Sequence, residues 1–104
     1  ASDFLRTLPP VEAGRKLYLK HGCAQCHSAD VTAGTGPTLK GIYGETHEMI
    51  GGDKLLVDDN YIRESILDPQ KKIRAGYQPV MSTYKGQISD AEITAVIEFI
   101  KSLK

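Results

Sequence analysis

Two cysteines separated by two residues, with a histidine directly after the second, constrain this chain more than any other feature. They form the run Cys23-Ala24-Gln25-Cys26-His27, and the chain has no other cysteine. A disulfide that closes so short a loop would stabilise little. A thioredoxin-like redox pair needs a strand before it and a helix after it, whereas here a helical pattern precedes the run and a glycine-rich loop follows. A zinc site would need a second Cys/His pair, which the chain lacks.

Covalent haem attachment explains both the residue types and their spacing. Two thiols add across the vinyl groups on one porphyrin edge, and the two intervening residues let a tight turn align both sulfurs with that edge. His27 then lies under the ring, where a neutral imidazole nitrogen can bind iron. The sequence therefore predicts one haem c, bound through Cys23 and Cys26, with His27 as an iron ligand. Because this attachment takes place outside the cytoplasm, we expect an extracytoplasmic location.

Length and composition fit one globular domain over residues 1–104. The chain is 40% hydrophobic and 25% charged, as ordinary soluble domains are. Its 13 basic residues balance its 13 acidic ones, which argues against a nucleic-acid or anionic-membrane binder. No run approaches the roughly 18 apolar residues of a membrane helix. We therefore expect no nucleic-acid partner and no membrane span within these residues.

Apolar periodicity predicts three helices, over residues 10–21, over 59–67, and after Ser89 to the end of the chain. Residues 1–8 show no period, so we expect a flexible lead-in there. Between the first two helices, a pair of glycines suggests a small β-hairpin or irregular loop over 46–57.

Local signals indicate where two of these helices begin and end. Asp58 or Asp59 can cap the middle helix, and Pro69 follows its end. Ser89 and Glu92 have the spacing of a capping box at the start of the last helix.

Iron held by one histidine needs a second axial ligand or leaves an open site. Met81 is the candidate we favour, because it lies in a proline-bounded loop far along the chain and its soft thioether suits iron(II). Met49 flanks a turn and is expected at the surface or in packing. His21 is too close to the attachment run to reach the opposite haem face. We expect His21 and His47 to be solvent-exposed or hydrogen-bonded histidines.

Together these pieces resemble the class I cytochromes c over nearly the whole chain. The attachment run, the loop from Gly34 to Gly41, the Met81 loop and the terminal helix all match. The resemblance implies an all-α fold of about three to five helices around one covalent haem. It also implies that the first and last helices cross near the haem edge, with Gly14, Tyr18 and Phe99 at the crossing.

The same resemblance suggests further residues around the cofactor. Pro37 matches a proline whose carbonyl accepts a hydrogen bond from the proximal imidazole, which would fix the tautomer of His27. Leu39 matches a residue that packs on the ring. Tyr43, Tyr77 and Tyr84 are candidates to line the pocket or to bind a propionate, and half-buried packing is the alternative for each.

A narrower likeness concerns residues 58–69, 76–81 and 84–86 and the insert at 46–57. These segments are similar to the cytochrome c domain fused to subunit II of caa-type haem-copper oxidases. That likeness implies a C-terminal domain that takes electrons from a soluble donor and passes them to the binuclear copper centre of subunit II. The domain would be tethered at the outer face of the membrane through a larger membrane protein. The chain holds no copper ligands of its own, since both cysteines are assigned to haem.

We therefore expect an electron-transfer domain that is not by itself an enzyme. The first alternative is a free periplasmic electron carrier with the same fold. The second is a haem sensor or peroxidase with an open iron site, which would require Met81 to be absent from iron.

Overall fold

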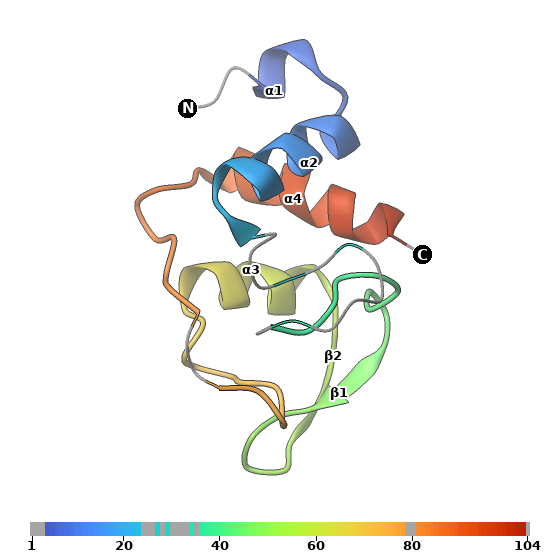
Figure 1. The fold of residues 1–104 in the computed structure, drawn as a ribbon, viewed down its shortest axis with the longest axis vertical. Helices are drawn as coiled ribbons and strands as arrows, with labels where there is room; N and C mark the ends of the chain where they lie inside the picture. The colour runs from blue at the N-terminus through green and yellow to red at the C-terminus, as the bar shows by residue number, and fades with distance from the viewer. Residues whose placement is uncertain are drawn as a thin grey trace.

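The computed structural model describes residues 4–23, 27, 29, 34, 36–78 and 81–103. This part of the chain forms four helices and two short strands (Figure 1). The helices are α1 (Phe4–Thr7), α2 (Pro10–Lys20), α3 (Asp59–Leu67) and α4 (Asp90–Ser102), and the strands are β1 (Thr46–Glu48) and β2 (Lys54–Leu56). The three predicted helices and the hairpin are confirmed. No helix among the described residues has the length and apolar character needed to cross a bilayer.

Helices α2 and α4 cross closely, as Figure 1 shows, and the crossing depends on a glycine. A Cβ atom at Gly14 would lie only 2.0 Å from the carbonyl oxygen of Ala95, so no side chain fits at this position. Beside it, the rings of Tyr18 and Phe99 are tilted at 45° with centroids 5.2 Å apart, a favourable aromatic geometry. The expected crossing of these helices at Gly14, Tyr18 and Phe99 is confirmed.

The core lies mainly between these two helices and α3. It buries the apolar stripe of α4 against α2, as amphipathic periodicity predicts. Each large aliphatic side chain buried in this way contributes roughly 1.5–3 kcal/mol. The largest side chains that are fully buried are Leu17, Val57, Ile93 and Ile97.

The starts of α3 and α4 follow the sequence signals. The carboxylate of Asp58 accepts a hydrogen bond from the backbone N–H of Tyr61 at 2.8 Å, so Asp58 rather than Asp59 is the cap. At α4, the Ser89 hydroxyl accepts from the Glu92 N–H at 3.2 Å, and the Glu92 carboxylate accepts from the Ser89 N–H at 2.9 Å. This reciprocal pair is the predicted capping box.

Strands β1 and β2 pair antiparallel, with His47 opposite Leu55. The chain turns through Gly51 and Gly52, whose φ angles of 100° and 98° favour glycine. The hairpin also holds a distant segment: Ile50 N–H donates to the Ile73 carbonyl at 2.7 Å, and Ala75 N–H donates to the Glu48 carbonyl at 2.8 Å.

The described part of residues 1–8 contains regular structure that the sequence did not indicate. Residues 4–7 form the helical turn α1, and Leu5 and Leu8 pack against the core. So short a helix is not stable alone and leaves no readable period in the sequence. Its stability comes from the tertiary contact of these leucines.

Candidate cofactor site

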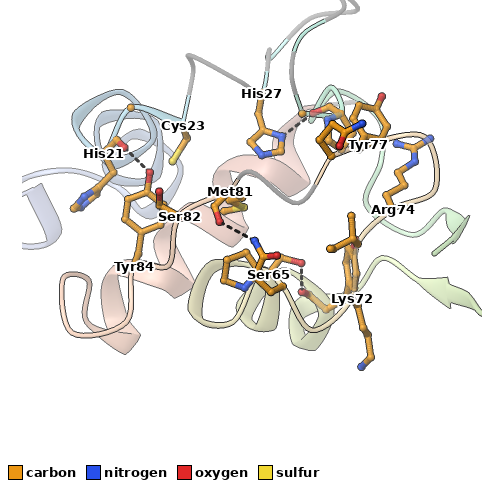
Figure 2. Close-up of a pocket in the computed structure, with 18 residues that line it drawn as sticks. His21, Cys23, His27, Ser65, Lys72, Arg74, Tyr77, Met81, Ser82 and Tyr84 are labelled. Carbon is orange, nitrogen blue, oxygen red and sulfur yellow. Dashed lines mark hydrogen bonds between the residues drawn. The ribbon is translucent and has the colours of Figure 1, made fainter. Parts of the chain in front are cut away.

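Two adjoining cavities, of about 260 and 110 Å³, lie between the end of α2, helix α3 and the segment around Met81. Figure 2 shows the side chains that surround the larger one. Nine residues line both cavities, so the two spaces form one site. These are His21, Cys23, His27, Pro37, Tyr61, Ser65, Arg74, Met81 and Tyr84.

His27 is fixed from several directions. Its Nδ1 lies 2.8 Å from the carbonyl oxygen of Pro37, and its own carbonyl accepts a hydrogen bond from the Tyr18 hydroxyl. A Cβ atom at Gly36 would lie 2.6 Å from Cε1 of the ring, so the backbone there lies against the imidazole.

The Pro37 contact also assigns the tautomer of His27. A carbonyl oxygen only accepts hydrogen bonds, so Nδ1 must carry the hydrogen. In the neutral ring, the lone pair is then on Nε2. This is the hydrogen bond that the resemblance implied, and it leaves Nε2 available as a metal ligand.

Cys23 follows the end of α2 and lines both cavities. In Figure 2 the Cys23 sulfur and the His27 ring both lie on the side of the backbone where Met81 is found. The carbonyl of Cys23 accepts a hydrogen bond from the His27 N–H at 2.9 Å, which links the two ends of the attachment run. Cys26 lies outside the described residues.

Met81 enters the same space from a separate chain segment (Figure 2). Its carbonyl accepts from Nε2 of Gln70 at 3.4 Å. The residues after it are bound to the last carbonyls of α3: Thr83 Oγ1 donates to Leu67 at 2.6 Å, and Tyr84 N–H donates to Ile66 at 3.1 Å. These carbonyls have no partner within the helix, so the Met81 segment satisfies them.

The other predicted cofactor contacts divide into two groups. Leu39 lines the smaller cavity, where it is 9% exposed, and Tyr77 lines the larger one. Tyr43 lies apart from the described lining of both cavities. Its hydroxyl donates to Asp59 at the surface, and the Lys101 ammonium lies 5.2 Å from its ring centroid. The prediction that Tyr43 contacts the cofactor has no support in this arrangement.

The structure adds three lining residues that the sequence did not single out. Tyr61 and Ser65 are four positions apart on α3 and therefore share one helix face. This four-residue spacing could have been recognised in the sequence. Arg74 reaches the site only because the hairpin holds its segment, and no local pattern indicates this.

Three other side chains could in principle bind iron: Met49, His47 and His21. The structure gives each of them a different environment. Met49 is 2% exposed, and its sulfur accepts from the Tyr61 hydroxyl at 3.7 Å, which confirms packing. His47 Nε2 lies 2.9 Å from the Glu45 carboxylate, as expected for a hydrogen-bonded histidine. His21 is half-buried, and its Nε2 is buried without a hydrogen-bond partner among the described residues, so neither expected environment is seen for this atom. Its ring packs edge-on against Tyr84, with centroids 5.6 Å apart.

The donor set fits haem c. The described walls contain an imidazole with a lone pair on Nε2, a thioether and a cysteine, together with apolar and aromatic side chains. The described residues contain no cluster of three or more His, Cys, Asp or Glu that could hold a metal ion directly. Gly36 lets the backbone lie directly against the imidazole, where a Cβ atom would clash with the ring. A flat, largely apolar cofactor with its own metal suits such walls better than a bare ion does.

Comparison with known proteins gives the family. The cytochrome c family model matches residues 11–104. The chain is 35% identical over 97 residues to cytochrome c 2.1 of Caenorhabditis elegans, covering 84% of this chain and 86% of that protein. It is 32% identical over 92 residues to cytochrome c2 iso-2 of Magnetospirillum molischianum, covering 79% and 91% respectively. The chain therefore belongs to the cytochrome c family, electron carriers that bind haem c covalently through cysteine.

Proposed function

We propose that this domain carries one electron at a time on a haem c joined to Cys23 and Cys26, with His27 and Met81 as axial ligands. The main support for this proposal is the fixed tautomer of His27. The Pro37 contact at 2.8 Å leaves the Nε2 lone pair available to bind iron, and Met81 lines the same two cavities from another segment.

Bound haem supplies the iron that changes oxidation state. The chain's own residues would hold that centre in place. Pro37 and Gly36 fix the imidazole, Leu39 packs in the smaller cavity, and the bonds of Thr83 and Tyr84 to α3 hold the Met81 segment. Ligation by a thioether and an imidazole would raise the reduction potential of the haem.

Two methionines allow a matched test of the axial assignment. Met81→Leu keeps the apolar bulk but removes the thioether, whereas Met49→Leu makes the same change at a buried methionine outside the described cavity lining. We expect Met81→Leu to lower the potential and to abolish the sulfur-to-iron charge-transfer band. Met49→Leu should change neither. A Met81→Leu protein with the parental spectrum and potential would contradict the assignment.

We further propose that the electron acceptor is the copper centre of oxidase subunit II, with this domain fused to it at the outer face of the membrane. Support comes from the sequence likeness of residues 58–69 and 76–81 to such domains. The described residues of these segments include helix α3 and the cavity-lining residues Tyr77, Gln78 and Met81. A free extracytoplasmic carrier is the second candidate. It is favoured by relatives matched over 86% and 91% of their own length.

Covalent haem survives denaturation, so a haem-stained denaturing gel separates these two candidates. Membrane and soluble fractions of the native cells should be stained and also probed with an antibody to this domain. A stained membrane band well above the size of this chain would support the fused domain. A stained soluble band at the size of this chain would support the free carrier and overturn the fusion. An antibody band without stain would overturn the haem assignment itself.

A further inference from the structure

The backbone around Arg74 is held beside the cavity by hydrogen bonds to the 46–57 hairpin. Arg74 itself forms an isolated antiparallel bridge with Met49. On either side, the Ile73 carbonyl accepts from Ile50 and the Ala75 N–H donates to Glu48, at 2.7 and 2.8 Å. Hydrogen bonds on both sides of Arg74 therefore fix the position of its backbone, from which the side chain extends.

The charged side chains in the described cavity walls are all positive. The walls include two permanently charged side chains, Lys72 and Arg74, and no aspartate or glutamate. The positive charge of Lys72 is already paired, because its Nζ lies 2.9 Å from the Glu64 carboxylate. Among the described residues, no carboxylate lies within ion-pair distance of Arg74. Its guanidinium instead lies 5.6 Å from the centroid of the Tyr77 ring, and the two side chains are neighbours in Figure 2.

A half-buried guanidinium without a carboxylate partner is well suited to bind an anionic part of the ligand. Its planar fork matches a carboxylate with two parallel hydrogen bonds, and such charge-assisted bonds are among the strongest in proteins. The cation–π contact with Tyr77 restricts the side chain before the ligand arrives, which lowers the entropy lost on binding.

We propose that Arg74 binds a propionate carboxylate of the haem, with Tyr77 as the residue that positions it. This inference rests on the haem site proposed above. It also gives the 46–57 hairpin a function, because the hairpin fixes the segment that carries this charge. Lys72, which is neutralised by Glu64, has no such role.

The test uses the holoprotein with a carbon isotope label in the propionate carboxyl groups. Redox-difference infrared spectra then report those carboxylates directly, apart from all protein carboxylates. We expect Arg74→Gln to shift the labelled bands toward those of a solvent-exposed carboxylate and to lower the reduction potential. Arg74→Lys should restore part of both changes, since it keeps the charge but loses the bidentate geometry.

Lys72→Gln is the matched control, because it removes a positive charge from the same walls without removing a propionate partner. It should leave the labelled bands in place. If Arg74→Gln also leaves them in place, or if both variants shift them equally, the inference is wrong. A wild-type protein with no labelled haem bands would instead contradict the proposed function, so the two failures are distinguishable. If Arg74→Gln does not fold, Arg74→Lys alone decides: unchanged bands would overturn the inference.

Discussion

The carbonyl of Pro37 lies 2.8 Å from Nδ1 of His27, while the backbone of Gly36 lies against the same ring. Neighbouring residues thus fix both the tautomer and the position of the imidazole. The glycine matters because a Cβ there would lie 2.6 Å from Cε1. The geometry of the proposed iron ligand is therefore set by backbone atoms, which move less readily than side chains.

Gly36→Ala should displace the His27 ring. We expect a loss of about 1–3 kcal/mol in unfolding free energy, as for other overpacked sites, together with a changed haem spectrum and potential. Gly41→Ala is the control, since a Cβ there meets open space while a φ of 74° still disfavours alanine. It should lower stability in denaturant titrations but keep the parental spectrum. Equal spectral changes in both variants would argue against the ring contact.

Gly14→Val should separate α2 from α4. The added carbons would overlap the Ala95 carbonyl oxygen, which lies 2.0 Å from the position that a Cβ would take, and would displace the neighbouring Phe99. Overpacking of this kind costs about 3 kcal/mol or more when backbone must move. Urea unfolding should show a clearly lower midpoint. An exposed change on the same helix, Lys16→Ala, should leave the midpoint nearly unchanged, and a similar midpoint for both variants would contradict the close crossing.

Tyr84→Phe should loosen the Met81 segment. The lost hydroxyl donates to the His21 carbonyl at 2.8 Å and so ties this segment to the end of α2 across 63 positions. A net loss of about 1 kcal/mol is expected, so added imidazole should displace Met81 up to about fivefold more readily. The readout is the disappearance of the sulfur-to-iron band during imidazole titration.

The matched control for that experiment is Tyr43→Phe. Tyr43 also donates a hydroxyl hydrogen bond, to Asp59, but lies outside the described lining of the cavities. Its removal should leave the imidazole titration unchanged. If Tyr84→Phe behaves like Tyr43→Phe, the contact with His21 does not hold Met81.

The Glu64–Lys72 pair should make stability depend on pH at the acid end. The hydrogen bond from Lys72 lowers the pKa of Glu64 in the folded state, with a further contribution from the charge of Lys71. A lowered folded pKa gives stability that is present above the unfolded value, about 4.3, and is lost as pH falls through the folded one. Because Lys72 is 41% exposed, the effect should stay below about 1 kcal/mol.

Glu64→Gln provides the measurement for this pair. The difference in unfolding free energy between it and wild type should be present at neutral pH and should shrink as the pH falls below the unfolded pKa and through the lowered folded pKa of Glu64. A difference that persists unchanged at low pH would contradict an ionic origin.

Local sequence signals predicted the local structure well. Helix α3 begins after Asp58 and ends before Pro69, and α4 begins at the Ser89 capping box. Each of these boundaries depends on side chains within a few positions, so no tertiary information was needed. The Gly14 crossing was also predictable, because it came with the family resemblance.

Features that depend on distant segments were missed. Helix α1 is held by the contact of Leu5 and Leu8 with the core, which no period in residues 1–8 indicates. Arg74 reaches the cavity because the hairpin pairs with its segment. In each case the deciding partner lies far along the chain.

In the proposed site, His27 and Met81 together occupy both axial positions of the iron. Carbon monoxide binding to the reduced protein at neutral pH tests this most directly, because the gas binds rapidly only where an axial position is open. We expect no rapid binding by the wild-type protein and rapid binding once Met81→Ala removes the thioether. Rapid binding by the wild-type protein would contradict the closed site and would favour a sensor or a peroxidase.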